Sequence, residues 1–180
     1  GVAHHCALFL ERAGLPELAP LGRLLAQLHD AGKAQPAFQR YIRGESAAKA
    51  PHSAAGALLA TGLMYELSKE LQLKKLPRTS QLLAYAISGH HRGLYDYAEL
   101  RNKLKEIDCK GRCEKTAKVL SGLRSEVQTW VEEHAESTEN SLKELAKRIG
   151  ATEQAQALIR LLFSCLVDAD FLDTEAFMDE

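Results

Sequence analysis

The residues best placed to do chemistry are histidines and aspartates that recur at four points of the chain. His29 and Asp30 are adjacent in the string His-Asp-Ala-Gly-Lys, which ends at Lys33. Imidazole nitrogens suit transition-metal ions, and a carboxylate has two oxygens with which it can bridge two ions. Gly32 would permit a sharp turn, and Lys33 could then hold a phosphate at the same place. A lone His-Asp pair also occurs at ordinary helix ends, so the full string carries the metal hypothesis.

Three further histidines follow at two points. His52 opens a long apolar stretch, and His90 and His91 stand together between two glycines. Taken singly, His52 is typical of an ordinary helix start, and the His-His pair is typical of a polar surface turn. Glycine lets the backbone approach closely, however, so both imidazoles of the pair could turn inward. We interpret all three as candidate ligands of the same metal site.

Two late aspartates complete the set. Asp168 and Asp170 lie in the apolar run Cys-Leu-Val-Asp-Ala-Asp-Phe-Leu-Asp. A carboxylate in an apolar helix is costly unless it is paired or bound to a metal. Each of the two continues an apolar stripe, so periodicity does not choose between them. With one of them, the set supplies enough ligands for two ions, which at ~3.5–4 Å apart can clamp a phosphodiester and activate water.

The composition limits the classes of partner. The chain has 180 residues, of which 46% are hydrophobic and 26% are charged, as in an ordinary soluble domain. Its formal net charge of −1 argues against strong non-specific binding to duplex DNA, but not against cleavage of a strand that another domain delivers. No apolar run reaches the ~18 residues of a membrane span, and the start is not a signal peptide. We expect a single cytoplasmic domain over residues 1–180, with a truncated N-terminus because the chain begins inside an apparent helix.

The elements that must position these residues are predicted to be helices, because the hydrophobic periodicity is helical almost throughout. Helices are expected over residues 2–13, 18–29, 35–41, 53–71 and 79–88, then around 114–134 and 139–149, and finally from 152 toward 168. Thr79 or Ser80 could cap the fifth helix, and Gly56 and Gly62 indicate close packing of the fourth. A turn is expected at 89–96 and a loop at 108–114. The fold class is all-α, with a topology that the pattern does not determine.

The ordered set resembles the HD superfamily of metal-dependent phosphohydrolases and, more narrowly, the CRISPR-associated HD nuclease domain of type I systems. The resemblance covers nearly the whole chain and is carried by the segments HDAGKAQPAFQRYI, PHSAAGA, SGHHRGL and CLVDADFLDTE. Generic HD enzymes share the His-Asp pair, whereas the HDxGK string followed by xxxFQ, and the Gly-His-His string, are closer to the CRISPR branch. The resemblance implies an HD-domain helical bundle with a metal site in its centre.

The resemblance also implies a role for each candidate residue. The implied metal ligands are His29, Asp30, His52, His90, His91 and Asp168. Asp30 would bridge two divalent ions, with His29 and the late aspartate on one of them and the other three histidines on the second. Lys33 matches a family lysine near the scissile phosphate, which makes Asp30 and Lys33 the implied catalytic residues. Histidine-rich ligation favours Mn²⁺, Fe²⁺, Co²⁺ or Ni²⁺ over Mg²⁺.

Two positions leave alternatives open. Asp168 is preferred as the late aspartate, because setting Thr174 on a family threonine places Asp168 on the ligand, and Asp170 is the second choice. The family's first metal-binding histidine lies four residues before the valine of a His-Leu-x-x-Val-Ala pattern, and aligning that valine with Val2 places the histidine before residue 1. His4 or His5 could substitute for it, or both could be surface residues.

The resemblance implies metal-dependent hydrolysis of DNA phosphodiester bonds, preferentially in single-stranded DNA, during type I CRISPR interference in a prokaryotic cytoplasm. The implied partners are single-stranded DNA, a superfamily 2 helicase that is fused or separate, and a guide-RNA surveillance complex, with no membrane. Two alternatives stay open. One is an HD-family nucleotide or cyclic-nucleotide phosphohydrolase, and the other is an inactive helical interaction module with a degenerate metal site.

Overall fold

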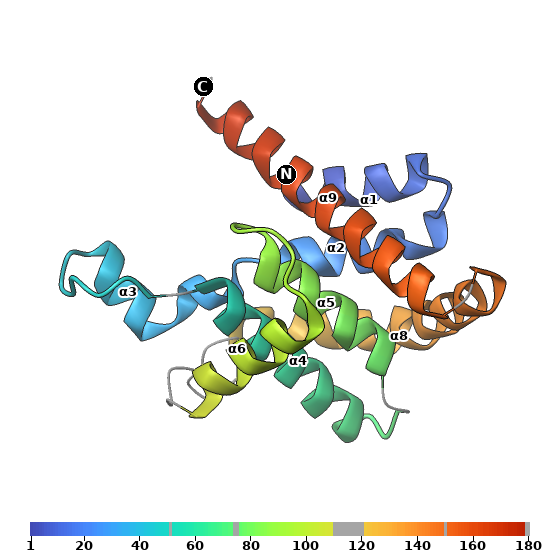
Figure 1. Ribbon diagram of the computed structural model, residues 1–180, viewed down its shortest axis with the longest axis horizontal. Coiled ribbons are helices and arrows are strands. Elements are labelled where there is room, and N and C mark those ends of the chain that lie inside the picture. Colours follow the sequence, from blue (N-terminus) through green and yellow to red (C-terminus); the bar gives the residue numbers. More distant parts are fainter. Residues whose placement is uncertain (51, 74–75, 110–120, 150, 179–180) are drawn as a thin grey trace.

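The computed structural model describes residues 1–50, 52–73, 76–109, 121–149 and 151–178, with the backbone alone described at 107–109, 148–149 and 151–154 (Figure 1). The α-helices in these ranges are α1 (Val2–Arg12), α2 (Ala19–Leu28), α3 (Pro36–Ile42), α4 (His52–Glu70), α5 (Pro77–Gly89), α6 (Tyr97–Cys109), α8 (Ser121–Ile149) and α9 (Ala151–Met178). Two 3₁₀ turns, η1 (Pro16–Leu18) and η2 (Ala31–Ala34), precede α2 and α3. No strand occurs among the described residues, which confirms the all-α prediction.

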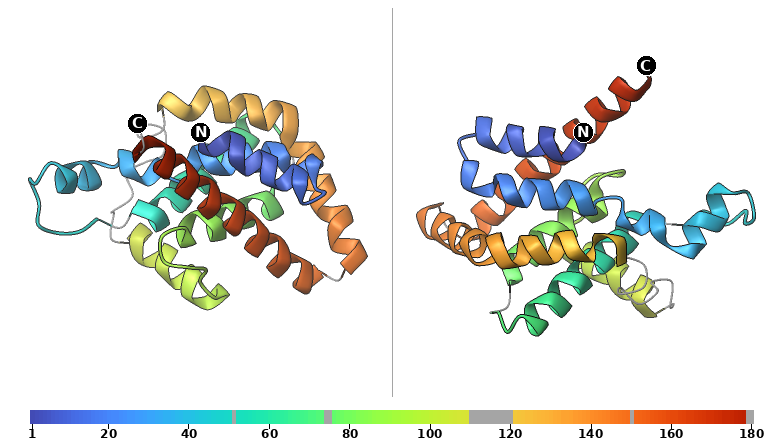
Figure 2. Two further views of the ribbon diagram at one scale, coloured as in Figure 1. Left: turned by 90° about the horizontal axis from the view of Figure 1, so that it is seen from above. Right: turned by 180° about the vertical axis from the view of Figure 1, so that it is seen from behind.

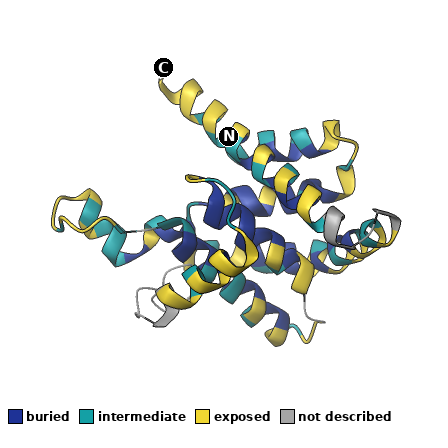
Figure 3. Cartoon of the chain, viewed as in Figure 1, coloured by how far each residue is buried: buried dark blue, intermediate teal, exposed yellow. Residues whose placement is uncertain are grey.

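The core forms where α2, α4 and α5 meet under α1 and α9. The closest helix packing joins α1 to α2 and α4 to α5, and α9 runs across α1 and α5 (Figure 2). Buried residues gather on the facing sides of these helices, whereas α3 contains no buried residue and the end of α9 is exposed (Figure 3). The largest fully buried side chains are Leu10, Leu18, Leu21, Leu24, Leu25, Leu28, Leu59, Leu63, Met64, Leu67, Leu83 and Ile87. The leucines of α2 lead directly into the His-Asp pair, so the core fixes the position of that pair.

The first five helices lie close to their expected ranges, but three later expectations were wrong. Residues 97–109 form α6, although their polar sequence indicated no helix. Residues 121–149 form one helix instead of two, and α9 continues beyond 168 to 178. Thr138 is buried at the expected break in α8, so tertiary packing holds that polar stretch helical. The expected loop at 108–114 and the start of the expected helix at 114 fall mostly outside the described residues.

The N-terminus of α5 is held by a partner from α8 and not by a cap of its own. Leu76 is the N-cap residue and makes no side-chain hydrogen bond there, so the expected cap by Thr79 or Ser80 was wrong. Instead, the Glu139 carboxylate accepts hydrogen bonds from the backbone N–H groups of Arg78 and Thr79 and from the Thr79 hydroxyl. An acidic group at this end also suits the helix dipole.

No helix among the described residues combines the length and the hydropathy that crossing a bilayer requires.

Candidate metal centre

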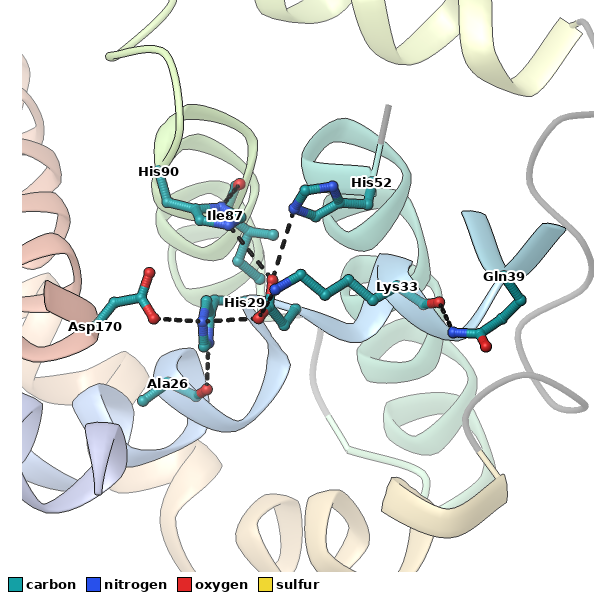
Figure 4. A network of polar contacts seen from close by, with 9 residues as sticks. Ala26, His29, Lys33, Gln39, His52, Ile87, His90 and Asp170 are labelled. Atoms are coloured by element: carbon teal, nitrogen blue, oxygen red, sulfur yellow. Dashed lines mark hydrogen bonds and ion pairs between the residues drawn. The ribbon is translucent and has the colours of Figure 1, made fainter. Parts of the chain in front are cut away.

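Four helix ends or helical segments converge on Asp30. His29 is the C-cap residue of α2, and Asp30 follows it as the N-cap residue of η2. His52 begins α4, and His90 is the C-cap residue of α5. Figure 4 shows these side chains turned toward one another, with Asp170 of α9 on the far side of His29. The sequence places them up to 141 residues apart, from His29 to Asp170, and helix packing brings them into one cluster.

Two glycines allow η2 to lie directly on the first turns of α4. A Cβ at Gly32 would lie 2.8 Å from the carbonyl carbon of His52, closer still to its oxygen, and 2.7 Å from the nitrogen of Gly56. A Cβ at Gly56 would lie 3.1 Å from the nitrogen of Gly32. The chain does turn tightly here, since the Lys33 N–H donates to the carbonyl oxygen of Asp30 at 2.8 Å, but Gly32 is not among the glycines with positive φ. Its lack of a side chain lets Asp30 and His52 approach, and the predicted close packing at Gly56 is confirmed.

His29 and His90 both turn Nε2 toward the cluster, because Nδ1 of each ring contacts a backbone carbonyl oxygen. The Nδ1 of His29 is 2.6 Å from the carbonyl oxygen of Ala26, and the Nδ1 of His90 is 2.7 Å from that of Ile87. Each carbonyl lies three residues earlier, in the last turn of a helix, where it lacks a partner within the helix. When Nδ1–H donates to that carbonyl, the neutral ring keeps its lone pair on Nε2. Both rings are therefore oriented with Nε2 toward the cluster, where it could ligate a metal ion.

The inward-facing atoms lack hydrogen-bond partners. Asp30 Oδ1 lies 3.6 Å from Nε2 of His52 and 3.6 Å from Nε2 of His90, and these three buried atoms have no hydrogen bond. The Nε2 of His29 is also buried without a hydrogen bond, and it lies 3.4 Å from Asp30 Oδ2. Acceptors that face acceptors repel unless a cation lies between them. Donors ~2.1 Å from one tetrahedral ion lie ~3.4 Å apart, so the observed spacings fit a shared ion.

The donors form two sets around the two oxygens of Asp30. Asp30, His52, His90 and His91 each offer a ligand atom within 4.8 Å of all the others, and His91 is the exposed member of this group. The rings of His90 and His91 have centroids 4.0 Å apart. On the other side, His29 lies between Asp30 and Asp170. The group of Asp30, His52, His90 and His91 thus fits a divalent ion with nitrogen and oxygen ligands of the kind that transition metals accept, and His29 and Asp170 extend the same chemistry beyond the second oxygen of Asp30.

Asp170, and not Asp168, faces the cluster. Asp170 Oδ1 lies 3.5 Å from His29 Nε2, whereas Asp168 is exposed. Successive helical residues are ~100° apart, so positions 168 and 170 point ~200° apart and only one of them can face His29. The preference for Asp168 as ligand therefore disagrees with this placement, and Asp170, the second choice, occupies the position.

Lys33 pairs with the oxygen of Asp30 that faces His29. Its Nζ lies 2.6 Å from Asp30 Oδ2, and 43% of its side chain is exposed. Burial would raise the pKa of the Asp30 carboxyl, but the polar contacts with His90 and Lys33 and the positive charge of His29 and Lys33 outweigh it. The pKa is therefore held well below its usual range, and Asp30 stays ionised. The 3.6 Å separation from His90 is too long for a full hydrogen bond, so Lys33 is the stronger partner.

The remaining imidazoles of the larger set are kept neutral. Burial lowers the pKa of His52 to about 4, helped by the charge of the neighbouring His91 and opposed by that of Asp30. Burial and the charge of His90 also lower the pKa of His91. A metal ligand must be unprotonated, so this environment keeps the nitrogens available near neutral pH.

His4 and His5 lie in the first turn and a half of α1 and do not belong to the metal-binding group among the described residues. Their rings contact each other, with centroids 5.7 Å apart, and His5 stacks on Phe9 with centroids 6.4 Å apart. His4 is exposed and His5 is half-buried.

The sequence reasoning assigned no role to two residues beside the cluster. Phe38 places its ring edge-on to His52, with centroids 4.8 Å apart, and the Gln39 side-chain amide donates to the carbonyl oxygen of Lys33 at 2.8 Å. They form the Phe-Gln pair that follows the His-Asp-Ala-Gly-Lys string after four intervening residues. The only available signal was this fixed spacing, which by itself assigns no contact.

A model of the family described as "Cas3, HD domain" matches residues 4–172. This span contains all of the residues placed in the cluster, from His29 to Asp170. No curated protein matches the chain.

Proposed function

The chain belongs to the Cas3 HD-domain family, and from this premise we propose that it is a metal-dependent nuclease that cuts single-stranded DNA in type I CRISPR interference. The family supports a CRISPR-associated HD phosphohydrolase. The choice of substrate and of CRISPR type is our proposal. A single observation carries it: the unpartnered Nε2 atoms of His52 and His90 face the unpartnered Oδ1 of Asp30 at 3.6 Å.

We infer that the two donor sets hold two divalent ions, with Asp30 shared between them. When bound, such ions lower the pKa of a water molecule and neutralise charge on the phosphate. Asp30 stays ionised because Lys33 is beside it, so it keeps one oxygen for each donor set. His29 and His90 are held in the ligating tautomer by Ala26 and Ile87. We propose Asp170 as the late aspartate, because it lies beside His29.

Lys33 is proposed to hold the scissile phosphate. Its ammonium group is 2.6 Å from Asp30 Oδ2 and its side chain is partly exposed, so a phosphate that reaches the centre would contact it. A fixed cation there would stabilise the negative charge that grows on the phosphate oxygens during hydrolysis. The reaction needs no nucleophile from the protein, and we propose direct attack by water without a covalent enzyme intermediate.

The exposure of the site favours a strand over a small nucleotide as substrate. His91 is exposed, and Asp30 and Asp170 each expose about a third of their side chains (32% and 33%). A nucleotide hydrolase would need a closed pocket with groups that recognise the base. The apolar hollow of about 310 Å³ between α5, α8 and α9 contains no candidate ligand. We therefore rank the nucleotide hydrolase and the inactive module below the nuclease.

We propose that a superfamily 2 helicase, fused or separate, delivers the strand and that a guide-RNA surveillance complex recruits both in the cytoplasm. The net charge of −1 supports this division of labour, because the chain has no general basic field with which to capture DNA itself.

The test is cleavage of circular single-stranded DNA during titration with Mn²⁺, Ni²⁺, Co²⁺ or Fe²⁺. We expect cutting that requires metal and that disappears in Asp30→Ala, while circular dichroism shows an unchanged helical content. Glu136→Ala, which removes an exposed carboxylate from α8, is the matched control and should cut normally. Undiminished cutting by Asp30→Ala would refute the assignment of the site. Turnover of cyclic nucleotides without cutting of DNA would support the nucleotide hydrolase instead.

A further inference from the structure

Beside the metal centre, α3 carries aromatic side chains that do not belong to the core. Phe38 contacts His52 edge-on, with ring centroids 4.8 Å apart and planes at 68°. Tyr41 lies one turn further along, with its centroid 6.4 Å from that of Phe38. Both rings are half-buried, and no residue of α3 is buried. Phe38 therefore contacts a proposed metal ligand, and Tyr41 extends the aromatic surface away from it along a helix without buried residues.

The helix that carries these rings is attached to the body by few contacts. It packs mainly on η2, and in Figure 1 it lies to one side of the other helices. The Gln39 amide ties it to the carbonyl oxygen of Lys33 at 2.8 Å. Leaving aromatic surface in water gives up the stabilisation that its burial would provide. The position of Phe38 and Tyr41 is therefore explained better by contact with a ligand than by packing of the fold.

Positive side chains lie before and between the two rings in the sequence. Lys33 precedes them and is partly exposed, and Arg40 stands between them on the exposed side of α3. Arg43 is engaged by Glu45 at 2.9 Å, whereas no ion pair of Arg40 is found among the described residues. Alternating cations and aromatic rings are the means by which proteins hold a single strand, with phosphates on the cations and bases on the rings.

We propose that Phe38, extended by Tyr41, stacks an unpaired nucleobase next to the phosphate that the metal centre cuts, while Arg40 contacts a flanking phosphate. This inference rests on the proposed nuclease function and gives a reason for its preference for single strands. Phe38 is one ring contact away from His52, so a base stacked there belongs to a nucleotide adjoining the cut. In a duplex each base is already stacked and paired, so it reaches the rings only after it is extruded.

The test is equilibrium binding of two fluorescent oligomers of equal length and charge, one of thymidine nucleotides and one with abasic sites, measured by anisotropy without added metal. We expect the wild-type chain to bind the thymidine oligomer at least about five-fold more tightly, as stacking of one base provides. Phe38→Leu should abolish this preference. Tyr65→Leu is the matched control, because Tyr65 is 63% exposed on the same α4 that begins with His52 but lies ~20 Å along it, and it should keep the preference.

A second variant at the same position distinguishes loss of the aromatic ring from a structural change caused by Phe38→Leu. Phe38→Trp should restore the base preference, and its added fluorescence should be quenched by the thymidine oligomer but not by the abasic one. The natural Trp130 is buried, with 6% exposed, and serves as the background signal in the wild type. Equal binding of both oligomers by the wild type, or an unchanged preference in Phe38→Leu, would overturn the stacking site even if the chain cuts DNA. A base preference that needs Phe38, in a chain that cuts no DNA with any metal, would support the stacking site and reject the nuclease.

Discussion

Replacing Gly32 by alanine should disable the proposed metal centre although no proposed ligand residue is substituted. The added Cβ would lie 2.8 Å from the carbonyl carbon of His52 and nearer to its oxygen, whereas ordinary contact begins at 3.4 Å. The first turn of α4 must therefore retreat by about 1 Å or more. The Asp30 Oδ1 to His52 Nε2 distance would then widen from 3.6 Å to roughly 4.5 Å or more. Two ligands at ~2.1 Å from one ion cannot be more than ~4.2 Å apart, so one of them would be lost.

We expect Gly32→Ala to lower cleavage by about a hundredfold or more, the usual effect of ~1 Å misplacement at a reacting centre. It should bind less metal per chain, measured by elemental analysis after desalting, and should lose ~1–3 kcal/mol of unfolding free energy through overpacking. The matched control is Gly122→Ala in α8, where the added methyl would meet nothing within 4 Å. That variant should keep its metal and activity and gain up to ~1 kcal/mol from helix propensity. Wild-type metal content and cleavage in Gly32→Ala would refute the argument from close approach.

Two further predictions concern the second donor set and the effect of pH. Asp170→Asn should weaken metal binding or cleavage by about tenfold to a hundredfold because it removes the carboxylate beside His29. Asp168→Asn should bind metal and cut DNA within about twofold of the wild type. Metal titration and cleavage assays would measure both variants. The opposite ranking would support the alignment that prefers Asp168. The metal-free protein should lose stability as the pH falls from 6.5 to about 4, because the folded-state pKa of His52, about 4, lies below its ordinary value and the unfolded chain binds that proton first. The loss of unfolding free energy is at most about 3 kcal/mol. In urea unfolding measured across this pH range, the stability of His52→Gln should depend less on pH than that of the wild type. The same pH dependence in both proteins would contradict the assignment.

The sequence by itself determined the helical fold class and predicted most of the residues that the structure gathers into one cluster. The leucines of α2 recur with helical spacing, which predicts a buried helix that ends at the His-Asp pair. The histidines at 52, 90 and 91 were selected by residue type, by the glycines around the pair and by their order with the His-Asp pair, although each of them alone is also typical of an ordinary helix start or surface turn. Such features are local, so they can be read before any packing is known.

The sequence could not decide features that depend on contacts between distant segments. Asp168 and Asp170 both continue apolar stripes, and only the rotation of α9 against α1 and α5 places Asp170 beside His29. Residues 135–138 were expected to separate two helices, yet α8 continues through them, with Thr138 buried and Glu139 bound to the start of α5. The role of Gly32 is set by the backbone of α4, twenty residues away in sequence, which no local pattern reveals. Periodicity fixes which face of a helix is apolar, but the position of a single side chain in a cluster depends on the register of one helix against another.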